Sequence, residues 1–419
     1  MRFLLTQSKL FLWVTIVSFV PHAMGKSLTL KQSVELGLQH NFSLQISKNT
    51  VEIANQNKKL GVGGLLPTAS VTANLTKSID PSADVVQSLG LQLGWTLFDG
   101  FRMFYAYSTL EEQRQRAKLI NRQKVEAVLL DVIQTYYSVW IQEQFQENRK
   151  QQVMISQRQL EKMRVKQEHG GATHREILQV EVAKNIDSSE YLKGELELIK
   201  VKDKLGLLLG LPVGTSIEVE GKMTPPKTPT DSVKWVKLII NNNSTLSFKK
   251  KEIRLQELEY KMNRAKFWPW LSASGNWQYT DGLPNGRGGS NTTVGLSLRF
   301  PLFEGFRNTV STQNAKVLLE NKKWSEKEYE LKLEYLISQK WLEIKLTRQQ
   351  LDFEKKALSL AEENFNLTEE QFERGAVSET VFQESRLALY QFQSRLIVAE
   401  YQALLTVFQL RFLAGKLEL

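Results

Sequence analysis

Apolar and polar residues alternate along four segments of the chain, two at about 67–97 and two at about 269–302. Each run is about 9–11 residues long, the length that a tilted strand needs to cross a bilayer. The polar positions are mostly Ser, Thr, Asn and Gly, which suits a wall that faces water. The pattern predicts strands with one apolar and one polar face. Two amphipathic hairpins packed on a soluble core would give the same alternation.

Two long stretches, 101–169 and 306–374, contain no Gly and no Pro. At ~1.5 Å per residue, a helix over either stretch is about 100 Å long. Apolar residues recur in each stretch at the three-four spacing of a coiled-coil seam (Val125, Leu129, Val132, Tyr136 and Val139 in the first; Leu333, Ile337, Trp341 and Ile344 in the second). Each helix then meets a glycine-containing turn and a return helix. Hairpins of this length cannot bury their seams in a compact globule, so they must pack against neighbours.

The whole pattern occurs twice. TLFDGFR at 96–102 corresponds to PLFEGFR at 301–307, and the intervals 41–67 and 243–269 both run from Asn to Pro. Equivalent positions keep an almost constant spacing across half of the chain, which indicates two structurally equivalent repeats. We expect the first repeat at 26–225 and the second at 226–419. Each should contain a short helical stretch, two strands and a long helical hairpin, the hairpins at about 101–209 and about 306–414.

Residues 1–25 have the pattern of a secretory signal peptide. Arg2 and Lys9 give a positive start, 10–20 is apolar, and Ala23-Met24-Gly25 has the small residues of a cleavage site. The apolar run is shorter than the roughly 20 residues of a spanning helix. An N-terminal membrane anchor is the alternative. The mature chain is expected to begin near Lys26, outside the cytoplasm.

Composition narrows the class of protein. The chain contains no cysteine, so its stability must come from packing or assembly. Its net charge of +10 is scattered along the predicted helices, which fits a solvated surface better than a nucleic-acid site. After residue 25 no uninterrupted apolar run is long enough for a spanning helix, so crossing a membrane would require a closed barrel of strands. Four strands cannot close a barrel, and at least two chains would have to contribute.

The segment LTLKQSVELGLQHN at 28–41, the Leu-Pro before the first strand, the Phe-Asp-Gly and Phe-Glu-Gly after the second strands, and the Gly turns together resemble the outer-membrane efflux protein family of TolC-type channels. The resemblance runs from about residue 28 to the C-terminus. It implies a mixed α/β membrane protein, a homotrimer in the bacterial cell outer membrane. Its 12-stranded transmembrane β-barrel would continue into a long α-helical coiled-coil periplasmic tunnel.

The resemblance also implies a function and partners. The expected function is a passive exit duct of a tripartite efflux or type I secretion system. Its partners would be a periplasmic adaptor (membrane fusion) protein, an inner-membrane transporter and outer-membrane lipid, without nucleic acid. A soluble periplasmic coiled-coil scaffold or adaptor is the alternative, but it would not need membrane-length strands in both repeats.

In this family the hairpin tips close the periplasmic entrance and receive the adaptor. The corresponding residues here are Gly170, Gly171, Ala172, Thr173 and His174 in one repeat, and Arg374, Gly375, Ala376, Val377 and Ser378 in the other. Glycine also supplies the left-handed backbone that such a turn needs without any partner.

TolC-type channels can carry two acidic residues three apart after the second turn. The matching positions are Val381 and Glu384, of which only Glu384 is acidic. We expect Glu384, helped by Glu379, to form a pore constriction. A solvated helix glutamate is the ordinary alternative.

The strand–helix junctions contain Phe98 and Gly100 in one repeat and Phe303 and Gly305 in the other, and we expect structural roles for them. No catalytic constellation, metal site or cofactor motif is found. His169 and His174 flank a turn, but they lack the spacing of a metal pair. The chain is therefore not expected to be an enzyme.

Overall fold

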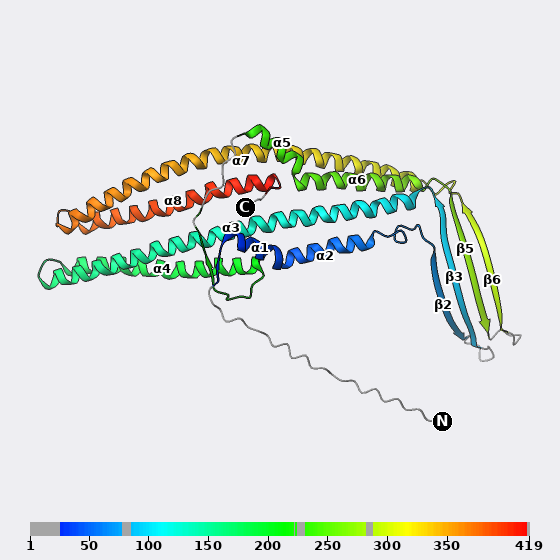
Figure 1. Ribbon diagram of the computed structural model, residues 1–419, viewed down its shortest axis with the longest axis horizontal. Helices are drawn as coiled ribbons and strands as arrows, with labels where there is room; N and C mark the ends of the chain where they lie inside the picture. Colours follow the sequence, from blue (N-terminus) through cyan, green and yellow to red (C-terminus); the bar gives the residue numbers. More distant parts are fainter. Residues whose placement is uncertain (1–25, 78–84, 222, 224–230, 282–287, 417–419) are drawn as a thin grey trace, which may run out of the picture.

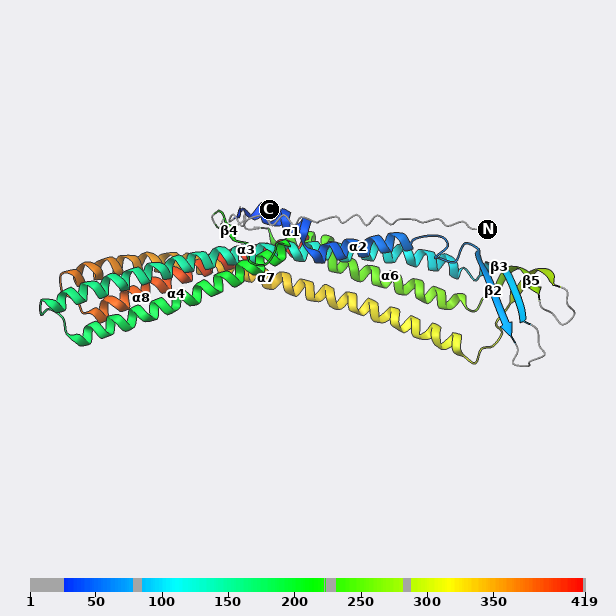
Figure 2. The ribbon, with the colours of Figure 1, turned by 90° about the horizontal axis from the view of Figure 1, so that it is seen from below.

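The computed structural model describes residues 26–77, 85–221, 223, 231–281 and 288–416, and the expected signal peptide at 1–25 lies outside them. The molecule is elongated, with a β-sheet at one end and the turns of two helical hairpins at the other (Figure 1; Figure 2). The elements follow in the order β1 (Lys26–Leu28), α1 (Leu30–His40), α2 (Phe42–Asn57), β2 (Thr68–Lys77), β3 (Val85–Asp99), α3 (Arg102–Glu168), α4 (His174–Leu209), β4 (Ile217–Val219), α5 (Ser232–Asn242), α6 (Ser244–Ala265), β5 (Trp270–Asp281), β6 (Gly289–Arg299), α7 (Arg307–Glu373) and α8 (Glu379–Leu413).

The four long strands form one antiparallel sheet in the order β2-β3-β5-β6. Its register places most of the apolar residues of the four strands on the same face. Val71 lies opposite Leu91, and Leu91 lies opposite Trp277. Because side chains alternate across a strand, most of the Ser, Thr and Asn residues lie on the other face. The strands β2 and β6 are the open edges of this sheet.

The long helices α3 and α7 each contain 67 residues; α3 begins at Arg102, just after β3, and α7 begins at Arg307, after a short connection from β6. Each pairs with its return helix, α4 or α8, and each also packs against a shorter helix, α2 or α6, on the side nearer the sheet (Figure 1). The internal duplication expected from the sequence is therefore confirmed in the fold.

Equivalent asparagines hold the two repeats in the same geometry. Asn41 caps α2, where its Oδ1 accepts a hydrogen bond from Leu44 N at 3.3 Å, and its Nδ2 donates to Leu208 O at 2.9 Å. Asn243 caps α6 in the same way and donates to Leu413 O at 3.1 Å. Each asparagine side chain thus accepts a hydrogen bond from a free N–H group at the start of one helix and donates one to a carbonyl at the end of the return helix.

The core of the first repeat lies where α1, α3 and α4 meet, and it includes Val132, Leu205 and Leu209. The short parallel pair β1–β4, which the sequence pattern did not predict, closes this core. The buried hydroxyl of Tyr136 lies 2.5 Å from Glu220 O, to which it donates, and 3.0 Å from Leu28 O. Burial raises the pKa of Tyr136 to about 12, so the hydroxyl stays a donor at any physiological pH.

One helix among the described residues, α8, is long and apolar enough to cross a membrane by length and composition. It packs along α7 and α3 in the hairpin region, and a third of its apolar window (33%) is buried there.

Candidate functional site

Both hairpin turns lie at the end of the molecule farthest from the sheet (Figure 1). Gly170 and Gly375 adopt left-handed backbone angles, with φ of 77° and 73°. The next residue in each turn, Gly171 or Ala376, donates its backbone N–H to a carbonyl of the preceding helix, at 2.7 and 2.8 Å. These are the hydrogen bonds of a Schellman-type helix end, and glycine adopts the required φ without strain.

The return helices start with side-chain caps. Thr173 and Glu176 form a capping box at the start of α4, and Ser378 Oγ accepts from Val381 N at 3.4 Å at the start of α8. The remaining tip residues, Ala172, His174, Arg374 and Val377, are exposed or partly exposed around the two turns. The expected tip residues of both repeats therefore lie at one end of the molecule.

Because of the capping box, we expect the stability of the start of α4 to depend on pH. The hydrogen bond from Thr173 N, at 2.7 Å, holds the pKa of the Glu176 carboxyl below its usual value. A carboxyl with a depressed pKa stabilises the folded state above its unfolded pKa, and this stabilisation is lost as the pH falls through the folded pKa. We therefore expect acid to loosen the start of α4. Hydrogen exchange at residues 173–177, corrected for intrinsic rates, should show protection at pH 7 that falls below about pH 4. In Glu176→Gln this protection should vary less with pH, and an unchanged profile would contradict the assignment.

Contacts between α3 and the second hairpin join the two tips. Gln159 Nε2 donates to Glu379 Oε2 at 2.6 Å, and Lys162 Nζ lies 3.2 Å from Glu373 Oε1. The structure thus places Glu379 against α3, whereas Glu384 is exposed one turn further along α8. The two acidic residues therefore have different surroundings.

A buried ion pair lies beyond these contacts and was not anticipated from the sequence. Arg386 Nη1 on α8 donates to Asp187 Oδ2 on α4 at 2.8 Å and to Gln152 O on α3 at 3.3 Å. The Arg386 residue is 2% exposed. The sequence indicates this ion pair only in that Arg386 lies on a face of α8 that is otherwise apolar, between Phe382 and Leu389. This cluster fixes the second hairpin to both helices of the first.

The strand–helix junctions repeat as closely as the tips. The rings of Phe98 and Phe101 meet edge to face at 5.3 Å, and those of Phe303 and Phe306 do so at 5.4 Å. Phe101 and Phe306 have φ of 69° and 62°. Positive φ is uncommon for aromatic residues, and the residue type at these two positions does not indicate it.

Within the described residues no group of three or more His, Asp or Glu side chains could hold a metal ion. His169 Nδ1 lies 2.9 Å from Val165 O of its own helix, and His174 is exposed.

Solved structures share this fold. The Campylobacter jejuni CmeC outer membrane channel aligns at 15% identity over 92% of this chain and 85% of its own, with a TM-score of 0.79. The open state of the Neisseria gonorrhoeae MtrE outer membrane channel aligns at 14% identity over 92% and 89%, with a TM-score of 0.77. The outer membrane protein VceC of Vibrio cholerae aligns at 15% identity over 93% and 97%, with a TM-score of 0.75. A comparison with curated proteins gave no match.

The architecture is therefore that of a TolC-type outer-membrane channel. The family model described as outer membrane efflux protein matches residues 34–210 and 235–416, one segment in each repeat. The chain belongs to this family and is an outer-membrane efflux duct with a periplasmic extension. A soluble periplasmic scaffold or adaptor does not fit this membership.

Proposed function

We propose that three copies of the chain form one conduit, which passively conducts substrates outward for a tripartite efflux or type I secretion system and catalyses no reaction. Three four-stranded sheets would close a 12-stranded barrel, and the paired long helices would form the periplasmic tunnel. An isolated sheet with two open edges would leave backbone groups unpaired in lipid, which is prohibitive. The trimer supplies the missing neighbours.

The observation that carries this proposal is a stripe of exposed apolar side chains along α7. Most of its members recur every seven residues, as in a coiled-coil seam, although the described residues leave each of them at least 50% exposed (Val310, Val317, Trp324, Leu331, Leu342, Leu346, Phe353, Leu360 and Leu367). Exposed apolar residues also line α2 and α4, the helices of the first repeat (Phe42, Ile46 and Ile53; Leu178, Val182, Ile186, Leu192, Leu196 and Ile199). Side-by-side association of copies would bury α7 against the first repeat of a neighbour.

A charge in the α7 stripe should prevent assembly. Trp324 is 65% exposed in the single chain. Because burying an aromatic side chain contributes about 1.5–3 kcal/mol, Trp324→Asp should reduce the trimer fraction by more than about tenfold. Lys323→Asp adds the same carboxylate at the neighbouring exposed position of α7 and serves as the control. Native mass spectrometry of detergent-purified protein measures the trimer, and full trimer in Trp324→Asp would contradict this seam.

The hairpin tips are the proposed periplasmic entrance and the contact surface for an adaptor, through which an inner-membrane transporter delivers cargo. The support is their exposure and their common position at one end of the molecule. Co-purification with the native adaptor should be weakened by a bulky residue in either turn, as in Ala172→Trp or Ala376→Trp. A tag that recovers the adaptor equally from both variants would place the contact elsewhere.

Glu384 is the proposed constriction residue, with Glu379 as a secondary contributor. Glu384 is exposed, while Glu379 accepts hydrogen bonds from Gln159 and Gln383. We expect Glu384→Gln to lower the cation-to-anion permeability ratio in single-channel recordings, and Glu379→Gln to change it less. An unchanged ratio in Glu384→Gln would remove Glu384 from the constriction.

A further inference from the structure

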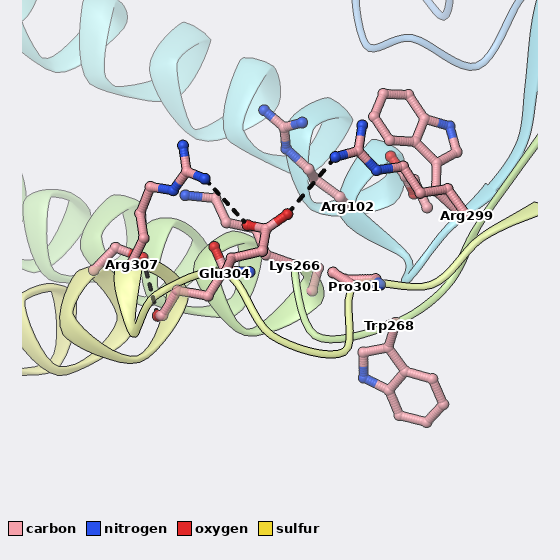
Figure 3. A pocket seen from close by; sticks show the side chains of 12 residues that line it. Arg102, Lys266, Trp268, Arg299, Pro301, Glu304 and Arg307 are labelled. Atoms are coloured by element: carbon pink, nitrogen blue, oxygen red, sulfur yellow. Dashed lines mark hydrogen bonds and ion pairs between the residues drawn. The ribbon is translucent and has the colours of Figure 1, made fainter.

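A cavity of about 400 Å³ lies at the junction between the sheet and the helices (Figure 3). Its walls come from the end of β3 and the start of α3, the end of α6, the start of β5 and the end of β6, and the start of α7. Arg102, Lys266, Arg299 and Arg307 contribute their side chains to it, and Asp99 and Glu304 are the acidic residues in its lining. Cationic groups thus outnumber carboxylates in the cavity.

The carboxylates are already engaged. Asp99 Oδ1 accepts a hydrogen bond from Met103 N at 3.1 Å at the start of α3. Glu304 lies between two arginines, 3.8 Å from Arg299 and 3.9 Å from Arg307 (Figure 3). Both distances exceed the 2.7–2.9 Å of a charge-assisted hydrogen bond, so each guanidinium keeps donors for another acceptor.

The other two cations have no carboxylate of their own among the described residues. Lys266 Nζ donates to the neutral Asn263 Oδ1 at 2.7 Å, and Arg102 makes no ion pair in the described part of the chain. Trp268 and Trp270 add apolar walls to the cavity. The arrangement is complementary to an anionic group attached to an apolar or aromatic body.

The first repeat shows that this charge is not needed to build the junction. Arg307 and Glu304 correspond to Arg102 and Asp99. By sequence spacing, the positions that correspond to Lys266 and Arg299 are Gly64 and Gly94, and the strand–helix turn of the first repeat forms without either cation. Lys266 and Arg299 are therefore an addition of the second repeat, and the fold does not require them.

The sheet register shows on which face the cavity opens. Arg299 lies opposite Trp270, and Trp270 lies opposite Asp99, so one row of the sheet lines the cavity. Alternation places this row with Ser272 and Ser297 on the polar face, away from Leu271 and Leu298. In a membrane barrel of this size the polar face lines the water-filled interior.

We propose that this cavity binds the phosphate, sulfate or carboxylate group of organic anions that pass through the conduit. The proposal rests on the proposed function, because solutes would reach the polar face through the conduit. Two or more guanidinium groups hold one such group with bidentate hydrogen bonds, and the nearby ammonium adds charge. Three copies would place a ring of these sites where the barrel meets the tunnel. A phospholipid headgroup carries the same chemistry, and the experiment separates the two sources.

The test compares the full-length protein, purified in detergent, with the double variant Lys266→Gln/Arg299→Gln. Isothermal titration with inorganic triphosphate at low ionic strength measures binding. We expect the double variant to bind at least about tenfold more weakly, and wild-type affinity to fall as salt is added. The control is Lys193→Gln/Lys200→Gln, which removes two charges from exposed positions of α4 and should bind like wild type. Single-channel recording in zwitterionic bilayers should show block of wild type by triphosphate.

Equal binding by wild type and the double variant, or no binding by wild type, would overturn the site. In either case normal conductance would leave the proposed conduit intact, whereas loss of conductance in wild type would count against the conduit itself. Native mass spectrometry in the presence of phosphatidylglycerol provides the lipid arm. If wild type retains the lipid, the double variant loses it and wild type does not bind triphosphate, then the ligand of the cavity is a lipid headgroup. That result would overturn the proposal.

Discussion

Gly100→Ala is expected to destabilise the protein by about 2–5 kcal/mol, whereas the equivalent change Gly305→Ala should cost about 1–2 kcal/mol. Both glycines follow a strand and have positive φ, 70° and 60°, so both substitutions carry the cost of a left-handed alanine. Their surroundings differ. A Cβ at Gly100 would lie 2.5 Å from Ala265 O and 2.6 Å from Trp268 Cβ, while a Cβ at Gly305 meets nothing within 4 Å.

The difference arises because the second repeat packs closely against the backbone at Gly100. Ala265 ends α6 and Trp268 lies in the connection between α6 and β5, and both pack against the backbone of the first junction. A backbone carbonyl cannot move aside as a flexible side chain can, so the added methyl must displace the connection. The expected damage therefore includes the cavity lined by Trp268 and Arg102.

Thermal unfolding of the two purified variants, followed by circular dichroism, measures this pair of substitutions. Gly305→Ala is the matched control because it changes the same residue type, at the equivalent position and at nearly the same φ. Gly100→Ala should have the lower Tm and the lower yield of assembled protein. Equal Tm values would mean that the close approach at Gly100 is not maintained in the folded protein.

Local periodicity explains why much of the fold could be predicted from the sequence. The alternation around Leu91 and Trp277 depends only on which face of a strand each residue occupies, and the register confirms a shared apolar face. Likewise, a stretch without Gly or Pro and with three-four spacing needs no tertiary information to be assigned as helix. Because the chain is duplicated, each strand and helix pattern occurs twice, and the second occurrence supports the assignment of the first.

Features that depend on distant parts of the chain were missed. The three-residue strands β1 and β4 are too short to show alternation, and their pairing joins Leu28 to Val219. The left-handed backbone of Phe101 and Phe306 is not a preference of phenylalanine, so the residue type did not indicate it. The cavity with Arg102 and Arg299 combines segments that no sequence window contains together.

The largest local effect is expected at the buried ion pair, where Arg386→Met should destabilise the packing of the two hairpins by about 3–5 kcal/mol. The side chains of Arg386 and Asp187 are only 3% and 13% exposed. Loss of the guanidinium would leave the Asp187 carboxylate out of water without its partner, and would leave Gln152 O without a donor. An unpaired buried charge costs far more than a lost surface contact.

A double variant distinguishes the contribution of the ion pair from the cost of leaving one buried charge unpaired. In Arg386→Met/Asp187→Leu both charges are replaced by apolar side chains, so most of the stability should return. Lys162→Met is the surface control, because Lys162 and Glu373 also join the two repeats but are 59% and 61% exposed. That pair should contribute about 0–1 kcal/mol.

Hydrogen-exchange mass spectrometry can locate the effect. Arg386→Met should lose protection in the segments 150–160, 180–190 and 380–390, while the short helices near the sheet stay protected. The double variant should recover this protection, and Lys162→Met should resemble wild type. If Arg386→Met alone keeps wild-type protection, the charge pair does not hold the hairpins together, and the apolar contacts at the tips (Leu160, Met163, Ile177 and Val180 in the first repeat; Phe365, Phe372 and Phe382 in the second) suffice.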